Sequence, residues 1–435
     1  MAKQHLLVLG LILSGSVLFA ACSDVKLNDG SGGATGDAGA KAEAGGAGKP
    51  VGAAGEAGDV GAGGEAGAVA DVDPPVLDPV GVIIPSKGPT TLSHLLVGAS
   101  DFGAKSSEVA SVTLGTGKVA GTDTYADGDV VAIGSAGVSF AVERSNDKVN
   151  LLDTGKIATT FDLKDKGTDT KPVDSKAYVP LYNKSAIAIL DLTEGKVSRR
   201  IDLSAYNVAA DKDLSVDVAE GVYEPKSNIV YFLLQRIDLT TYDKDFHLPC
   251  TATTALLVGI DAATDEEVDV NGATAGKALA LTLTNPRSLS VNADGDTLYM
   301  LADGCYTAGK PKNRGVEVVD LTEHSTTVAY TDTSTELLLS LVLIGGSNAL
   351  IETSDETTFA THWRKLDVAG GTLNGELTGM PSSPTYDGKD FLGVEITGKV
   401  GAVVRYTIAT EKSVVVSPTS WAGDYTVSST TALVE

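Results

Sequence analysis

From about residue 81 onward the chain is a succession of short apolar runs separated by polar turns. Val, Ile, Leu, Thr and Tyr occur in groups of about five to eight, and Gly, Asp, Asn and Pro interrupt them. Runs of β-branched and aromatic residues bounded by turn formers are typical of β-strands. No amphipathic stretch of helical period stands out, so the pattern predicts an all-β domain over 81–435.

The clearest unit of this pattern is Ala177–Leu203. A strand opening at Tyr178 is followed by a second strand at Ala186–Leu190, a turn at Thr193–Lys196 and a returning strand at Val197–Leu203. Two short strands separated by a Gly-containing turn indicate an antiparallel hairpin. The unit is therefore expected to be three consecutive strands of one sheet.

The same order of strand, polar loop, strand, turn and strand recurs along the chain. The copies start near Leu95, Phe140, Tyr178, Val230, Thr297, Ala349 and Phe391. A single copy leaves its apolar faces uncovered, and stacking between two neighbours buries both. An Asp often ends the second strand, as Asp191 does, and we expect its carboxylate to accept hydrogen bonds from backbone amides of the following turn.

Two of the copies resemble a known repeat family. Ala177–Leu203 resembles the YVTN-type β-propeller repeat, and the matching residues are Tyr178, Val179, Tyr182, Ile187, Ile189, Asp191, Gly195, Lys196 and Val197. Pro286–Tyr299 resembles the inner strand and hairpin of that family. The resemblance spans about Leu95 to Glu435 and implies a seven-bladed β-propeller with four-stranded antiparallel blades around a central channel.

Two details of this expected ring can be read from its ends and spacings. The last residues, Trp421–Glu435, have strand character and no repeat of their own, so we expect them to pair with the first copy around Leu95 and close the ring. The segment Lys164–Lys176 is short and polar, which leaves little room for an inner strand in the third copy.

Trp363 has two interpretations, packing between blades or a recognition aromatic, and packing is favoured.

The first 21 residues predict an export signal. Lys3 supplies a positive charge, and Leu6–Ala21 is an uncharged apolar run too short for a membrane span. Leu18-Phe19-Ala20-Ala21-Cys22 resembles the lipobox of bacterial lipoproteins, although Phe19 stands where Leu is usual. The alternative is an ordinary signal peptide with an incidental Cys. The resemblance implies a lipidated Cys22 and, because Ser23 rather than Asp follows, localisation to the cell outer membrane or cell surface.

Residues 22–80 predict a flexible Gly/Ala-rich linker. Gly and Ala dominate, and Val is almost the only apolar residue with a larger side chain after Leu27. Such a segment cannot bury enough surface to offset its conformational entropy, so we expect disorder. A Gly-rich chain of this length reaches about 40 Å on average, enough to hold a folded domain clear of a membrane.

The charge balance excludes some classes of partner. The formal net charge is −24 and the sequence pI is about 4.5, which argues against nucleic acid and anionic lipid because phosphate binding needs clustered Lys and Arg. The charge is explained by an acidic soluble surface or by affinity for cations such as Ca²⁺. Asp127-Gly128-Asp129 and Asp294-Gly295-Asp296 have the spacing of calcium ligands, but they are interpreted first as hairpin turns.

Two insertions, Arg236–Thr254 and Ala302–Arg314, are the candidate sites. Each carries one Cys, and for an exported protein a Cys250–Cys305 disulfide is favoured over a metal site or two free thiols. Equivalent loops of consecutive blades emerge on one face, which brings the two together. The candidate ligand-binding residues are Asp243, Asp245, His247, Tyr306, Lys310 and Arg314, with Lys312 beside them. The alternative is a pair of solvent-exposed loops without a ligand.

No catalytic motif is recognised. Apart from His5 in the signal, the histidines His94, His247, His324 and His362 are far apart, and the sequence has no H-x-x-x-H, C-x-x-C-H or G-x-S-x-G pattern. We therefore predict no catalytic residue, no metal and no cofactor. The predicted function is a lipid-anchored, monomeric cell-envelope propeller acting as a binding or scaffold module for protein or glycan. The alternative is a lactonase-like hydrolase with a metal at the channel mouth.

Overall fold

The computed structural model describes residues 92–434 with short gaps. The gaps fall at 102–104, 115, 136–137, 183, 244–246, 251–252, 273–275, 347, 357, 359, 382, 388, 398 and 422–425. The expected signal peptide, Cys22 and the expected linker all lie outside the described residues. Within them, no helix has the length and apolar character needed to cross a membrane.

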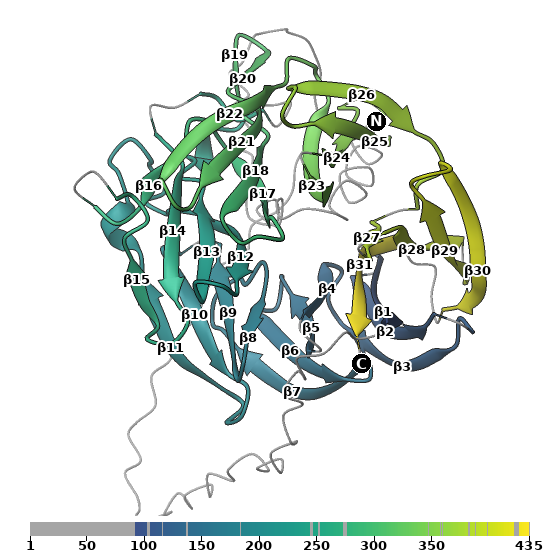
Figure 1. The fold of residues 1–435 in the computed structure, drawn as a ribbon. Coiled ribbons are helices and arrows are strands. Elements are labelled where there is room, and N and C mark those ends of the chain that lie inside the picture. Colours follow the sequence, from purple (N-terminus) through teal and green to yellow (C-terminus); the bar gives the residue numbers. More distant parts are fainter. Residues whose placement is uncertain are drawn as a thin grey trace, which may run out of the picture. The chain divides into compact units, whose positions relative to one another are not determined.

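The described strands form seven antiparallel sheets, six of four strands and one of five, arranged as the blades of a β-propeller (Figure 1). We number the blades along the chain and give the innermost strand first. Blade 1 is β31 (Thr426–Val434), β1 (Leu92–Asp101), β2 (Ser106–Thr113) and β3 (Val119–Tyr125). Blade 2 is β4 (Val130–Ser135), β5 (Val138–Glu143), β6 (Lys148–Asp153) and β7 (Lys156–Asp162). Blade 3 is β8 (Lys171–Val173), β9 (Lys176–Leu181), β10 (Ala186–Asp191) and β11 (Lys196–Asp202).

The second half of the ring carries the additional short elements. Blade 4 is β12 (Val218–Glu224), β13 (Ile229–Leu234), β14 (Leu256–Asp261) and β15 (Glu266–Val268), with β16 (Leu279–Ala280) also paired to β14. Blade 5 is β17 (Pro286–Val291), β18 (Thr297–Ala302), β21 (Gly315–Asp320) and β22 (Ser325–Thr331), with a hairpin of β19 (Cys305–Thr307) and β20 (Lys310–Lys312). Blade 6 is β23 (Leu337–Gly345), β24 (Asn348–Ser354), β25 (Thr361–Asp367) and β26 (Thr372–Leu377). Blade 7 is β27 (Thr385–Tyr386), β28 (Phe391–Thr397), β29 (Val400–Thr407) and β30 (Lys412–Ser420). Two 3-10 turns, η3 (Ser204–Tyr206) and η4 (Leu239–Thr241), lie in loops.

The C-terminal strand closes the ring, as predicted. β31 is the innermost strand of blade 1 and pairs antiparallel with β1, with Leu95 opposite Ala432. Trp421 precedes this strand and is buried in the apolar cluster that joins blade 7 to blade 1. The two ends of the described chain are thus held in one sheet.

The unit Ala177–Leu203 is confirmed as three strands of blade 3, β9 to β11. Asp191 Oδ1 accepts from the backbone amides of Thr193 and Glu194, both at 2.9 Å, as predicted. Gly195 follows with a φ of 66°, a conformation that favours glycine. The inner strand of this blade, β8, has only three residues, in agreement with the short segment that precedes it.

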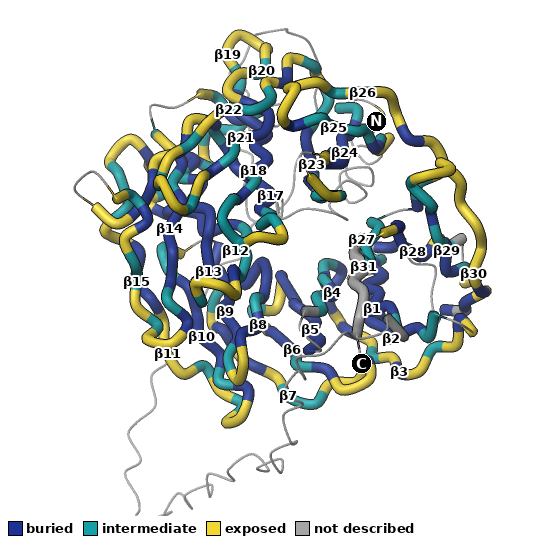
Figure 2. Tube along the Cα trace, viewed as in Figure 1, coloured by how far each residue is buried: buried dark blue, intermediate teal, exposed yellow. Residues whose placement is uncertain are grey.

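Aliphatic side chains between neighbouring sheets form the core. The largest such cluster joins blade 3 to blade 4, where Tyr178, Ile187 and Phe232 are fully buried. Trp363 packs between blades 6 and 7 against Phe391, with ring centroids 5.6 Å apart, so the packing interpretation is confirmed. Burial is greatest in middle strands such as β5, β13 and β24 and least along outer strands such as β30, where Val414 is exposed (Figure 2).

The two Asp-Gly-Asp segments differ from each other in position. Asp294–Asp296 forms the turn between β17 and β18, as predicted. Asp127–Asp129 lies instead in the connection from β3 to β4, so its interpretation as a hairpin turn is wrong. Asp127 accepts from the amides of Asp129 and Ser145, both at 2.9 Å, and so ties this connection to blade 2.

Deleting Ser428–Glu435 should strongly destabilise the protein. The deletion removes most of the innermost strand of blade 1 and exposes the edge of β1, so the loss should far exceed that of a frayed terminus. The melting temperature of the full chain and the truncated chain measures this. An unchanged melting temperature would contradict closure through β31.

Candidate functional site

Four loops on one face of the propeller carry most of the residues of interest. Strands alternate in direction within a blade, so connections between blades and connections from the second to the third strand emerge on the same side. These include the connections β11–β12, β13–β14, β18–β21 and β24–β25. We call this side the loop face. The predicted insertions lie here, between the second and third strands of blades 4 and 5.

The predicted disulfide is present. Cys250 and Cys305 are bonded, with their Cα atoms 4.8 Å apart. The backbone continues the connection, because the amide of Tyr306 donates to the carbonyl of Leu248 at 2.7 Å and the amide of Cys250 donates to the carbonyl of Tyr306 at 3.2 Å. The loop from blade 4 and the hairpin from blade 5 are therefore one connected structure.

Next to the disulfide, loops of three consecutive blades contribute to one cluster. The rings of His247 and Tyr306 are stacked, with centroids 4.0 Å apart and planes 7° from parallel. His247 Nδ1 lies 3.4 Å from Asp243 Oδ2, and His247 Nε2 lies 3.5 Å from Glu356 Oε2. The Tyr306 hydroxyl donates to Glu356 Oε1. We call Asp243, His247, Tyr306 and Glu356 the platform.

The platform combines predicted and unpredicted residues. Three of the candidate residues, Asp243, His247 and Tyr306, are brought together as expected. Glu356 was not predicted, because it lies in blade 6, outside the two insertions. Burial and the Glu356 carboxylate raise the pKa of the Tyr306 hydroxyl, so this group is a hydrogen-bond donor at neutral pH.

The other candidate residues lie elsewhere. Lys310 and Lys312 are exposed on β20, and Asp245 lies outside the described residues. Arg314 is fully buried at the start of β21. Its Nη2 lies 2.8 Å from Asp303 Oδ1, and its Nε lies 3.5 Å from Asp332 Oδ2.

Arg314 belongs to a buried ion-pair network that lies close enough to Tyr306 and Glu356 of the platform to interact with them electrostatically. Asp303 also binds Arg287, whose Nη2 lies 2.9 Å from Asp303 Oδ2, and it accepts from the amide of Leu338 at 3.0 Å. Arg314 also donates to the backbone carbonyls of Ser334 and Glu336. The guanidinium therefore holds blade 5 to the start of blade 6 from within the protein.

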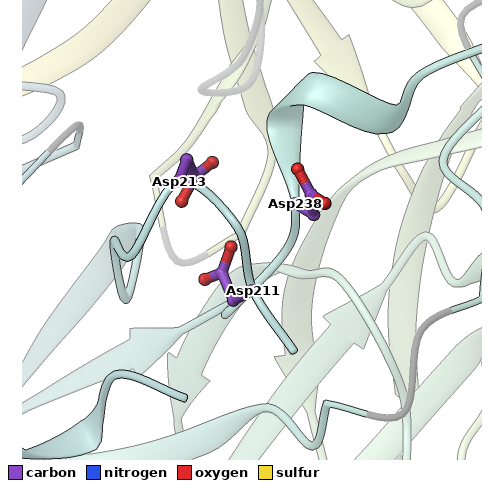
Figure 3. Close-up of side chains that lie close together, drawn as sticks. All are labelled: Asp211, Asp213 and Asp238. Atoms are coloured by element: carbon purple, nitrogen blue, oxygen red, sulfur yellow. The ribbon is translucent and has the colours of Figure 1, made fainter. Parts of the chain in front are cut away.

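A second group on the loop face contains none of the predicted site residues. Oxygen atoms of Asp211, Asp213 and Asp238, one from each carboxylate, all lie within 4.8 Å of one another. The first two residues belong to the β11–β12 connection, and Asp238 caps η4 at the start of the blade 4 insertion (Figure 3). We call these residues the acidic cluster. Asp211 and Asp238 are 1% and 2% exposed.

The surroundings of the acidic cluster raise the pKa of nearby carboxyl groups. Burial and the adjacent Asp213 raise the pKa of Asp211 to about 7. Burial, with Asp213 and Asp211 nearby, raises the pKa of Asp217 to about 8. The hydroxyl of Tyr182 is also buried, and its pKa is raised by burial and by neighbours that include Asp217 and Asp213. The only sequence signal for this group is the run of Asp211, Asp213 and Asp217 in one loop.

Comparisons with known proteins identify no family and give only distant structural likenesses. No protein-family model and no curated protein matches the sequence. Among solved structures, a periplasmic gluconolactonase of Pseudomonas aeruginosa is 13% identical, with a TM-score of 0.47, and the match covers 79% of this chain and 100% of that one. A functionally unknown protein of Desulfotomaculum acetoxidans is 10% identical, with a TM-score of 0.48, and 77% and 98% of the chains are covered. AztD of Citrobacter koseri is 13% identical, with a TM-score of 0.44 and coverage of 79% and 99%.

Replacing Arg314 by Met should lower the free energy of unfolding by roughly 3–5 kcal/mol, since removing one partner of a buried ion pair leaves the others uncompensated. Denaturant unfolding measures the loss. The matched control is Lys312→Met on exposed β20, which should change stability little. Equal stability of the two variants would show that the network does not hold the loop face.

Proposed function

We propose that the chain is a lipid-anchored propeller of the bacterial cell envelope that acts as a non-catalytic binding module. The observation that carries this proposal is the platform, to which loops of three consecutive blades contribute. A disulfide and the Arg314 network hold those loops to the sheets. Binding residues are commonly presented on loops that a rigid scaffold positions.

The chemistry of the platform suits recognition of a polar partner. It presents an aromatic pair, a hydroxyl and two carboxylates, of which His247 and Tyr306 are partly exposed. Tyr is enriched among residues that dominate binding energy because it supplies a large contact area and a polar group at low entropic cost. The partner would be an envelope protein or a glycan.

The proposed lipid anchor, cellular location and repeat type rest on sequence motifs. The lipobox-like residues ending in Cys22 support lipidation, and Ser23 supports the outer membrane or cell surface. The residues from Tyr178 to Val197 support a YVTN-type repeat, since they match its strand and turn positions in order.

The alternative, a lactonase-like hydrolase, has one feature in its favour. The acidic cluster offers carboxylates for a metal ion. However, all three residues come from the junction of blades 3 and 4 rather than from several blades around the channel, and two of them are buried. A catalytic metal needs an open coordination position that substrate can reach. The binding module is therefore the function that the geometry favours.

A pull-down from envelope extract tests the binding proposal. The full chain should capture a partner, and Tyr306→Ala should weaken capture by about tenfold or more if the platform is the energetic centre. Lys277→Ala, at an exposed position in the β15–β16 connection outside the platform, is the control and should bind as the unmodified chain does. Protease treatment and periodate treatment of the extract separate a protein partner from a glycan. Equal capture by both variants would contradict a role for the platform.

Membrane fractionation tests the anchor. The full-length protein should be found in the outer-membrane fraction, and Cys22→Ser should move it to the soluble fraction because the lipid chains supply the membrane affinity. Finding the Cys22→Ser protein still in the membrane fraction would contradict lipid anchoring while leaving the platform proposal intact.

A further inference from the structure

We propose that Asp211, Asp213 and Asp238 bind a calcium ion that joins the β11–β12 connection to the start of the blade 4 insertion. The three side chains come from two segments that are about 25 residues apart and meet on the loop face (Figure 3). An ion bound here would act as a structural link between two loops, and it would lie beside the platform-bearing insertion rather than within the platform.

The spacing of the oxygen atoms fits Ca²⁺. Ca²⁺ binds oxygen ligands at about 2.3–2.6 Å, so two ligands on opposite sides of the ion are about 5 Å apart. One oxygen from each of the three carboxylates lies within 4.8 Å of the other two. Mg²⁺ is smaller and usually keeps several waters, whereas Asp211 and Asp238 are almost completely buried.

Backbone amides already hold two of the three carboxylates in place. Asp213 accepts from the amide of Ser215 at 3.0 Å and from the amide of Leu239 at 3.1 Å. Asp238 Oδ1 accepts from the amide of Thr240 at 3.1 Å. The ligand oxygens are therefore oriented without the ion, which lowers the entropic cost of binding.

Unsatisfied buried oxygens provide a second and independent indication. Neither carboxylate oxygen of Asp211 has a hydrogen-bond partner, and Oδ1 of Asp217 and the hydroxyl of Tyr182 have none either. All three side chains are more than nine-tenths buried. Native proteins rarely leave buried polar atoms unpaired, because each loses its hydration without replacement. A cation bonded to Asp211 would supply the missing interaction.

The positive side chains nearby do not satisfy these oxygens. Lys212 is largely exposed, with its Nζ 3.7 Å from Asp238 Oδ2. Arg236 lies close enough to Asp211 to interact electrostatically, but its Nη1 donates to the carbonyl of Thr254 at 2.8 Å. Arg287 is paired with Asp303. Neither Lys212 nor Arg236 therefore donates a hydrogen bond to the carboxylate oxygens of Asp211.

Binding at this position would reach the platform through η4. Asp238 caps η4, and the chain continues from η4 to Asp243, His247 and Cys250. The amide of Ile237 donates to Asp217, and the amide of Leu239 donates to Asp213. The residues on both sides of Asp238 are therefore held by neighbouring carboxylates. Calcium would therefore stabilise the first part of the insertion.

The test uses the full chain, stripped with a chelator and dialysed. Isothermal titration with CaCl₂ should show one site per chain, and the melting temperature should rise with Ca²⁺, because a ligand that binds only the folded state stabilises it. Hydrogen exchange should slow at the amides of Ile237, Leu239 and Thr240. Mg²⁺ at equal concentration should have a much smaller effect.

Asp211→Asn is the decisive variant, and Asp294→Asn, in the β17–β18 turn, is its matched control. Asp211→Asn should weaken Ca²⁺ binding by about tenfold or more. It should also melt at a higher temperature than the unmodified chain when both are free of metal, because it removes a buried acidic group whose ionised form has no hydrogen-bond partner. Asp294→Asn should retain normal calcium binding.

The outcomes separate the possibilities. No binding of Ca²⁺ by the unmodified chain at millimolar concentration would overturn the proposal. Binding that Asp211→Asn retains would place the ion elsewhere and also overturn it. An equal response to Mg²⁺ would overturn the assignment to calcium. If Asp211→Asn does not fold, slower exchange at Leu239 and Thr240 in the unmodified chain still decides the location.

Discussion

The pairing of β31 with β1 is the constraint on which the rest of the structure depends. It joins the C-terminal strand to the first blade along nearly all of β1, from Leu92 to Ser100. A propeller blade buries its apolar faces only between two neighbours, so an open ring would expose blade 1 and blade 7. Closure therefore lets every blade contribute to an interface, and it allows the loops to occupy defined positions.

The closed ring supports the loops of the loop face. Irregular loops carry many polar backbone groups and have few apolar contacts of their own, so they need support from the sheets. Blades 4, 5 and 6 provide it through Cys250–Cys305 and the buried Arg314–Asp303 pair. The proposed calcium ion would give similar support to the other side of the blade 4 insertion, where Asp238 begins η4.

Much of the fold could be predicted because the relevant signals are local. The apolar alternation of Ala177–Leu203, the Asp191 turn and the strand-like end after Trp421 each depend on residues close in the sequence. Fewer of the contacts made by loop residues could be predicted. The turn at Asp127 proved to be a connection between blades, and Glu356 and the acidic cluster were missed, because no local pattern distinguishes such residues from other polar loop residues.

The sequence by itself determined the strands, the number of copies, the ring closure and the pairing of Cys250 with Cys305. The strands and the copies follow from a repeated short-range pattern, and repetition limits how the copies can stack. Ring closure follows from a strand-like last segment that has no repeat of its own, and the disulfide follows from the two cysteines other than Cys22. Only the tertiary structure decided which loop residues meet. His247 stacks on Tyr306, Arg314 is buried, and Asp211 lies beside Asp238, because these contacts depend on the paths of irregular loops and on the rotation between blades.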